Sequence, residues 1–518
     1  MATLIHDATV ITPDAGGWPV SADSAVPGPR PVRVLRHYSL VFDAGRVSAL
    51  APAASFTPRR AGGKFAEVVQ GTGYVVIPGL VNTHHHLYQS LTRCLPAAQN
   101  DRLFDWLRKL YEQWRRLDYR AVNLAAKVSI AELLLHGCTT TSDHFYMFPP
   151  GSDVRVEAVL DAATELGIRL HLCRGSMSLG RSAGGLPPDD CVEQDTDVLA
   201  DCQRVLDAYH DPQPYAMRRI DLAPCSPFNV TRELLRDTRR LARERGVLLH
   251  THLAETLEEE AYCLDKFGCR PAQYLADLDW LGPDVYLAHC VWLNEAEITL
   301  LARTNTAVSL CPTSNMRLGS GLPPIGRLVA AGVRLGLGVD GSSSNDGGNL
   351  LAEAKQALLV ARVLPVMGSI GGGTGVSPVI PGGRDAHPTL PPVIPAGRDA
   401  HPTLPPVEPL LPVADAFKLA TIGGAACLHR AELGHLNPGA AADCAMFRLD
   451  DIALAGGAAH DPLAALILCD APRAERVFVA GGEVVRDGRI VALDETALGA
   501  ELNDLIASGF SDRSARHT

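Results

Sequence analysis

The sequence predicts a (β/α)8 barrel, the TIM barrel fold, joined to a small β-sandwich domain. Two observations predict this architecture. Short apolar segments alternate with helix-compatible stretches through the middle of the chain, whereas strand-like runs separated by Gly and Asp dominate both ends. The length of 518 residues exceeds the size at which a single hydrophobic core stops growing, so we expect one large and one small domain.

The two ends of the chain are predicted to form the small domain together. Residues 1–75 contain strand-like runs such as ATLIHDATVIT and AEVVQGTGYVVI. Residues 435–518 contain RVFVAGGEVVRDGRIVAL, in which Gly-Gly and Asp-Gly are typical of tight turns between strands. We therefore expect a β-sandwich built from both termini, with the barrel formed by residues 76–434.

The middle of the chain holds eight candidate barrel strands. In chain order they are YVVIPGLVNTH, CTTTSDH, IRLHLCRG, IDLAPCS, VLLHTHLAE, VYLAHC, AVSLCP and VRLGLGVDG. Most are short and apolar, as parallel strands buried on both faces should be. A doubly wound open sheet is the structural alternative. The barrel is favoured because polar residues follow many different strands at their carboxyl ends, where barrel enzymes carry their chemistry.

A Pro- and Gly-rich segment at residues 368–412 interrupts the predicted barrel. The sequence VIPGGRDAHPTLPP at 379–392 recurs as VIPAGRDAHPTLPP at 393–406. This density of proline opposes a helix or a central strand, so we interpret the segment as an exposed, disordered insertion. Its two histidines, His387 and His401, are interpreted as copies carried along with the repeat rather than as metal ligands.

Composition excludes several classes of function. The net charge of −11 argues against a nucleic-acid-binding surface, which needs clustered positive charge. We find no apolar stretch long enough for a membrane helix and no signal-peptide pattern. The 13 cysteines are scattered without a Cys-x-x-Cys pair, which is typical of reduced thiols in a cytoplasmic protein. We expect a small-molecule substrate and neither a nucleic-acid nor a membrane partner; the sequence leaves homo-oligomerisation open.

Histidines at strand ends predict a metal site. In PGLVNTHHHLYQ, His84 and His86 share one face of an extended strand and His85 points away. In VLLHTHLAET, His250 and His252 also share a face, so spacing alone does not decide which of them binds metal. Pairs of imidazoles at the ends of buried strands suit a metal, although solvated histidines at a polar strand end would give the same pattern.

Three further residues extend this cluster. Glu255 follows the second histidine pair, where it is either an acid–base group or a carboxylate favoured at a helix N-terminus. His289 ends VYLAHC, where a buried core histidine is the alternative. Asp340 ends LGLGVD, where a turn-forming aspartate is the alternative. Because all of these residues fall at strand ends of one barrel, we interpret them together as a catalytic site.

The donor set predicts one divalent metal, zinc with iron(II) as the alternative. A metal bound by imidazoles and a carboxylate lowers the pKa of a bound water. Asp340 could then take the proton of that water, and Glu255 could protonate the substrate. A second metal would usually require a further bridging ligand, such as a lysine on the fourth strand. That strand reads IDLAPCSPF and holds no lysine, which favours a single metal.

At these residues the sequence resembles the amidohydrolase superfamily, in its cytosine and guanine deaminase and chlorohydrolase branch. The likeness runs from PGLVNTHHH to LNPGAAADCAMFRLD, nearly the whole chain. The family pattern H-x-H, H-x-x-E, H and D falls on His84, His86, His252, Glu255, His289 and Asp340. The resemblance therefore implies that His252, not His250, is the ligand. It also implies that Glu255 shuttles protons, that His289 lies beside the metal, and that Asp340 is both ligand and base.

The resemblance also implies a substrate. The stretches NTHHHLYQSLTR, PAAQNDRLFDWLRKLYEQW and APCSPFNVT imply hydrolytic deamination of 8-oxoguanine to urate and ammonia. Gln89 falls where guanine deaminases carry a glutamine and would bind a purine edge. Cys225 replaces a histidine of relatives that deaminate adenosine derivatives, which disfavours nucleosides. Trp106 and Arg174 are further substrate-binding candidates, with core packing and a structural ion pair as their respective alternatives.

Two other interpretations stay open at this point. Guanine, isocytosine-like pyrimidines or hydroxylated triazines could be the substrate on the same fold and with the same metal. A protein of another class, a non-catalytic barrel that serves as a scaffold, would be expected to have lost ligands. All of the ligand positions are filled in this sequence, which favours an enzyme.

Overall fold

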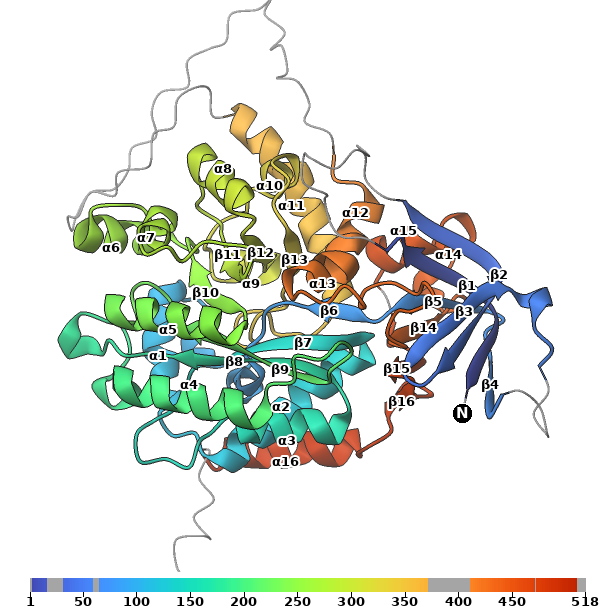
Figure 1. Ribbon diagram of the computed structural model, residues 1–518, viewed down its shortest axis with the longest axis horizontal. Coiled ribbons are helices and arrows are strands. Elements are labelled where there is room, and N and C mark those ends of the chain that lie inside the picture. Colours follow the sequence, from blue (N-terminus) through green and yellow to red (C-terminus); the bar gives the residue numbers. More distant parts are fainter. Residues whose placement is uncertain (1, 16–30, 59–64, 371–409, 471, 510–518) are drawn as a thin grey trace, which may run out of the picture.

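Eight parallel strands close into a barrel, as predicted (Figure 1). The computed structural model describes residues 2–15, 31–58, 65–370, 410–470 and 472–509. The barrel strands are β6 (Leu80–Asn82), β7 (Cys138–Phe145), β8 (Arg169–Ser176), β9 (Arg218–Pro224), β10 (Leu249–Leu253), β11 (Val285–His289), β12 (Ala307–Leu310) and β13 (Leu335–Leu337). Pairing of β13 with β6 closes the ring. Each predicted segment contributes one of these strands.

The first predicted segment forms two strands rather than one. Its N-terminal half is β5 (Tyr74–Pro78), which belongs to the terminal sheet, and its C-terminal half is β6 of the barrel. The break lies at Gly79, where a Cβ atom would lie 2.0 Å from Oγ1 of Thr139. Only glycine lets the chain pass this close to β7 as it crosses from the sheet into the barrel.

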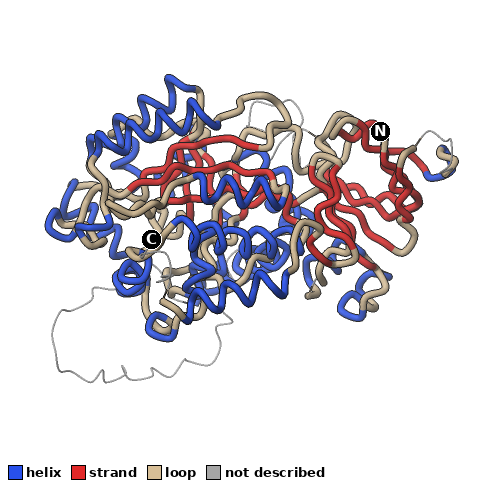
Figure 2. Tube along the Cα trace, turned by 90° about the horizontal axis from the view of Figure 1, so that it is seen from below, coloured by secondary structure: helices blue, strands red, loops and turns tan. Residues whose placement is uncertain are grey.

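Helices surround the barrel (Figures 1 and 2). They are α1 (Leu103–Trp114), α2 (Tyr119–Leu135), α3 (Glu157–Leu166), α4 (Asp195–Tyr209), α5 (Arg232–Arg245), α6 (Leu257–Phe267), α7 (Pro271–Asp277), α8 (Glu295–Thr304), α9 (Pro312–Arg317), α10 (Ile325–Ala330), α11 (Leu350–Ile370), α12 (Val413–Lys418) and α13 (Gly424–Cys427). Three more follow later in the chain, α14 (Gly457–His460), α15 (Pro462–Leu468) and α16 (Glu495–Ala507). None of the helices in the described part of the chain is long and apolar enough to span a membrane.

Helix α5 illustrates how the sequence sets these helices. Thr231 caps its N-terminus by accepting a hydrogen bond from the backbone N–H of Leu234. Gly246 ends it in the left-handed conformation, at φ +66°. Leucines of the helix, Leu235 and Leu241 among them, are buried, whereas most of its arginines are not. The helix therefore packs one apolar face on the barrel, as its amphipathic sequence indicates.

The two ends of the chain form one sheet beside the barrel, with strands from both termini (Figure 1). Its first strands are β1 (Thr3–Pro13), β2 (Val32–Asp43), β3 (Arg46–Pro52) and β4 (Glu67–Gln70). After the barrel follow β14 (Cys444–Arg448), β15 (Arg476–Val479), β16 (Gly482–Arg486) and β17 (Arg489–Ile490). Strand β5 pairs with β1 on one side and antiparallel with β14 on the other, so it joins the two halves. The domain limits given above stay predictions.

A buried ion pair fastens the sheet to the barrel. Arg169, at the start of β8, donates from Nε and Nη2 to the two carboxylate oxygens of Asp443, at 3.1 and 3.0 Å. Both side chains are almost completely buried. Asp443 also accepts a hydrogen bond from the backbone N–H of Ala480, in the turn between two strands of the sheet. The predicted insertion at residues 368–412, by contrast, lies almost entirely outside the described residues.

Candidate metal centre

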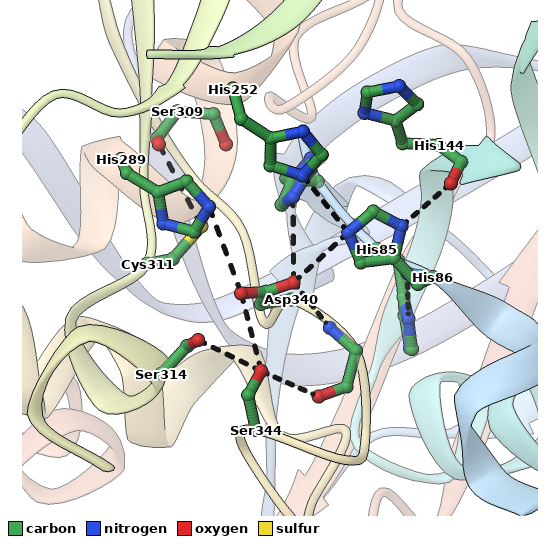
Figure 3. A network of polar contacts seen from close by, with 12 residues as sticks. His85, His86, His144, His252, His289, Ser309, Cys311, Ser314, Asp340 and Ser344 are labelled. Atoms are coloured by element: carbon green, nitrogen blue, oxygen red, sulfur yellow. Dashed lines mark hydrogen bonds and ion pairs between the residues drawn. The ribbon is translucent and has the colours of Figure 1, made fainter. Parts of the chain in front are cut away.

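Three histidines and one aspartate meet at the carboxyl end of the barrel. His84 and His86 follow β6, His252 lies in β10, and Asp340 follows β13. The Nε2 atoms of His84 and His86 lie 3.5 and 3.4 Å from Oδ1 of Asp340. The Nε2 atoms of His86 and His252 are 3.2 Å apart. Figure 3 shows the rings of His86 and His252 turned toward Asp340.

Hydrogen bonds on the far side of two rings determine which nitrogen faces this centre. Nδ1 of His86 lies 2.7 Å from the carbonyl oxygen of His144, and Nδ1 of His252 lies 2.6 Å from that of Cys225. A carbonyl only accepts, so each Nδ1 carries the proton and each Nε2 presents a lone pair. Two lone pairs facing each other repel unless a cation lies between them. The arrangement therefore fits a divalent metal.

His250 orients the third imidazole. Its Nδ1 donates to the carbonyl oxygen of Tyr286 at 2.7 Å, so its Nε2 is an acceptor. That Nε2 lies 2.8 Å from Nδ1 of His84, which must donate. Nε2 of His84 is left as a buried lone pair without a hydrogen-bond partner. Because both nitrogens of His250 are engaged, His252 is the member of the pair whose free nitrogen faces the centre.

Two further histidines lie beside the centre, His250 and His144, of which His144 was not predicted from the sequence. Ring nitrogens of His84, His144 and His250 also come within 4.8 Å of one another. His144 donates from Nε2 to the carbonyl oxygen of Ala223 at 2.9 Å, and its ring stacks on that of His252 with centroids 4.6 Å apart. We interpret His144 as packing against His252, since His250 has no nitrogen left for a second ion.

Asp340 is held in the ionised form and in an unusual backbone conformation. Burial alone would raise the pKa of its carboxyl, but the neighbouring imidazoles of His84, His289 and His86 lower that pKa well below its usual range. The backbone N–H of Gly341 donates to its Oδ1 at 2.6 Å. Its φ of +63° lies in the left-handed region, a strain typical of functional sites.

Glu255 and His289 face each other beside the centre. Oε2 of Glu255 lies 3.5 Å from Nε2 of His289. Asn315 donates from Nδ2 to Nδ1 of His289 at 3.0 Å, so Nε2 of His289 carries a proton that it can donate. Burial, together with the charges of Asp340 and Glu259, raises the pKa of Glu255 well above its usual range. A carboxyl group whose pKa is raised keeps its proton to higher pH, which suits a proton donor.

A cavity opens over these groups and brings three predicted substrate-binding residues to them. Gln89, Trp106 and Cys225 line the same cavity as Glu255 and Asp340. The Oε1 atom of Gln89 is buried and has no hydrogen-bond partner. Burial raises the pKa of Cys225 to about 12, so its thiol is neutral. The cavity thus combines acid–base groups with a free amide acceptor and aromatic walls.

Arg174 does not line this cavity. Its guanidinium donates to Glu193 at 2.6 Å and to Asp201 at 2.7 Å, and it lies over the ring of Phe148. The geometry is that of the structural ion pair named above as the alternative. We therefore do not assign Arg174 to substrate binding.

Comparison with known proteins identifies the family. The family model described as the amidohydrolase family matches residues 75–379, which include all eight barrel strands and all four candidate ligands. This chain belongs to the amidohydrolase family. The amidohydrolase is 42% identical over 459 residues to 8-oxoguanine deaminase of Pseudomonas aeruginosa, which covers 89% of this chain and 92% of the relative.

Two further relatives carry related names. Hydroxydechloroatrazine ethylaminohydrolase of Pseudomonas sp. (strain ADP) is 36% identical, over 83% of this chain and 82% of its own. The solved structure of atrazine chlorohydrolase from Arthrobacter aurescens TC1 complexed with zinc superposes with a TM-score of 0.81 at 30% identity, over 97% of this chain and 100% of its own. With these matches, the amidohydrolase is a hydrolytic deaminase of its family with a histidine-rich potential metal site.

Proposed function

We propose that this amidohydrolase deaminates 8-oxoguanine to urate and ammonia, with one divalent metal, zinc or iron(II), held by His84, His86, His252 and Asp340. The observation that carries the proposal is the shared cavity, which Gln89, with a buried amide oxygen that has no hydrogen-bond partner, lines together with Glu255 and Asp340. A divalent cation at these ligands would activate water for hydrolysis near neutral pH.

Gln89 recognises the purine. Its Oε1 is a buried acceptor without a partner, and its side-chain N–H groups can donate, so the amide matches an edge with adjacent N–H and C=O groups. Gln89 packs closely against the backbone of Gly341, where an added Cβ atom would lie only 1.9 Å from Oε1 of Gln89. Gln89 therefore holds the base next to Asp340, where the reaction takes place.

The proton transfers use two carboxyl groups. The oxygen of water adds to the ring carbon that bears the amino group, and Asp340 takes the proton released from the water. Glu255 delivers its proton to the adjacent ring nitrogen, and His289 donates a hydrogen bond to the incoming oxygen. Asp340 then passes its proton to the amino group, the hydroxyl formed from the water returns its remaining proton to Glu255, the C–N bond breaks, and ammonia leaves. 8-Oxoguanine and water are thereby converted to urate and ammonia.

The relatives support this substrate over the alternatives. The 42% identity to 8-oxoguanine deaminase extends over most of the chain. A hydroxylated triazine is the second candidate, since a relative at 36% identity is named for such a substrate. A non-catalytic scaffold has little support, because every ligand and both proton-transfer groups are in place. We propose a small molecule as the partner, without nucleic acid or membrane.

A substrate panel tests the proposal. Purified enzyme with its metal content measured would be given 8-oxoguanine, guanine, isocytosine and an amino-substituted hydroxytriazine, and the release of ammonia would be followed. We expect the highest kcat/KM with 8-oxoguanine, with urate as the product. Faster turnover of guanine or of the triazine would contradict the proposed substrate. Loss of activity in His252→Ala, with loss of the metal, is expected for an enzyme and not for a scaffold.

A further inference from the structure

A second buried amide lines the cavity and has no role in the chemistry described so far. Asn229 lies after β9 and is 1% exposed. Its Nδ2 donates to the hydroxyl of Tyr111 at 3.3 Å and to Sγ of Cys225 at 3.5 Å. Its Oδ1 is buried and has no hydrogen-bond partner. Hydrogen bonds therefore hold the nitrogen of the amide, whereas its oxygen has no donor.

The backbone of Asn229 is fixed as well. Its carbonyl oxygen accepts hydrogen bonds from the backbone N–H groups of Ser178 and Leu179, at 2.9 and 3.0 Å. Its own N–H donates to the carbonyl oxygen of Ser226 at 3.1 Å. With both backbone and side chain held, the free Oδ1 cannot easily turn to another partner within the protein. A buried carbonyl without a hydrogen bond is unfavourable, so a ligand with a donor group explains it best.

Asn229 lies on a different part of the wall from Gln89. Gln89 packs against Gly341, beside the candidate ligand Asp340. Asn229 is separated from the ligand His252 by Cys225, whose Sγ lies 3.9 Å from Nδ1 of His252. The residues that line the cavity therefore include one amide with an unpartnered oxygen next to the reacting groups and another beyond Cys225. A single-ring base is long enough to contact only the amide next to the reacting groups. A purine has a second ring, away from the reacting carbon, that can contact the other amide as well.

We propose that Oδ1 of Asn229 accepts an N–H group of the five-membered ring of the substrate and so selects 8-oxoguanine. This inference rests on the proposed function. 8-Oxoguanine carries N–H groups at both N7 and N9, on either side of its C8 carbonyl. Guanine carries only one N–H on that ring, and a single-ring base has none. The oxygen of Asn229 can accept a hydrogen bond but cannot donate one. It therefore favours 8-oxoguanine over the other bases, because 8-oxoguanine presents an N–H group at either nitrogen of the five-membered ring.

The experiment compares three bases in the Asn229→Leu variant, which keeps the size of the side chain and removes the acceptor. Values of kcat/KM would be measured for 8-oxoguanine, guanine and isocytosine, or inhibition constants for any base that is not turned over. We expect kcat/KM for 8-oxoguanine to fall about tenfold or more, the preference for 8-oxoguanine over guanine to shrink, and isocytosine to change by less than about threefold. Metal content would be measured on the same samples.

A second variant guards against a merely structural effect. Tyr111→Phe removes the hydroxyl that holds Nδ2 of Asn229 but leaves Oδ1 in place, so we expect a smaller loss in the same order among the three bases. An equal loss on all three bases in Asn229→Leu, or an unchanged preference for 8-oxoguanine in both variants, would overturn the role of Asn229. Wild-type enzyme that fails to deaminate 8-oxoguanine would instead overturn the proposed function, and this inference with it.

Discussion

Nε2 of His250 lies 2.8 Å from Nδ1 of His84, and this contact fixes the nitrogen that His84 turns toward the metal centre. His250 is itself fixed by the carbonyl oxygen of Tyr286. Strand spacing makes His250 a rival of His252 for the role of metal ligand. The two hydrogen bonds show that His250 instead orients another ligand, His84. Such supports tune metal affinity because they set the tautomer and the orientation of the ring.

The first prediction concerns His250. We expect His250→Ala to weaken metal binding roughly 10–100-fold, since His84 loses the acceptor for its Nδ1 proton. The affinity would be measured by competition with a chromophoric zinc chelator. His37→Ala is the matched control, because His37 is exposed and pairs only with Asp7 among the contacts observed for its ring. Unchanged metal affinity in His250→Ala would contradict the support role.

The second prediction concerns Glu255. We expect Glu255→Gln to lower kcat about 10²–10⁴-fold while the metal is retained, because the amide keeps the shape of the side chain but has no acidic proton to transfer. Ammonia release and metal content report the two effects separately. Glu193→Gln serves as a control carboxylate outside the cavity, paired with Arg174. A rate within a few fold of the wild type would remove Glu255 from the proposed chemistry.

The third prediction concerns the approach of Gly341 to Gln89. A Cβ atom at Gly341 would lie 1.9 Å from Oε1 of Gln89, so Gly341→Ala must displace that side chain. We expect kcat/KM for the purine to fall roughly 100-fold, as a substrate misplaced by about 1 Å would do. Gly347→Ala is the control, because its nearest neighbour outside the adjacent residues lies 3.9 Å away. Equal activity of the two variants would argue against a role for Gln89.

The fourth prediction concerns the joint between barrel and sheet. We expect Asp443→Ala to lower the free energy of unfolding by about 3–5 kcal/mol, because it leaves the guanidinium of Arg169 buried without its carboxylate partner. The exposed pair of Arg448 and Asp450 is the control, and Asp450→Ala should lower the free energy of unfolding far less. Urea denaturation measures both. Equal losses in the two variants would mean that the buried ion pair contributes no more to the free energy of unfolding than the exposed one.

Much of the fold could be predicted from the sequence, because buried parallel strands are short apolar runs bounded by polar residues and turns. All eight barrel strands were found in this way, and so was the sheet formed by both ends of the chain. The break at Gly79 was missed, since the residues on either side are apolar in both the sheet and the barrel. Only the packing of Thr139 against that glycine requires it.

The site was less fully accessible from the sequence. Strand alternation places His250 and His252 on the same face. The family resemblance implies His252 as the ligand, and the hydrogen bonds of the two rings show that His250 is a support instead. Asn229 and Asn315 carry no signal in the sequence, because each is a single amide in a loop or short helix. Arg174 has the residue type of an anion-binding group, but its partners Glu193 and Asp201 lie far along the chain from it.

The formation of urate from 8-oxoguanine by metal-loaded enzyme tests the central claim most directly. We predict about one divalent metal per chain, urate and ammonia in equal amounts, and a higher kcat/KM for 8-oxoguanine than for guanine, isocytosine or an aminohydroxytriazine. Removal of the metal with a chelator should abolish the reaction, and zinc should restore it. Two results would contradict the account. One is an enzyme that leaves 8-oxoguanine intact when it is loaded with metal, and the other is an enzyme that forms urate equally well after its metal has been removed.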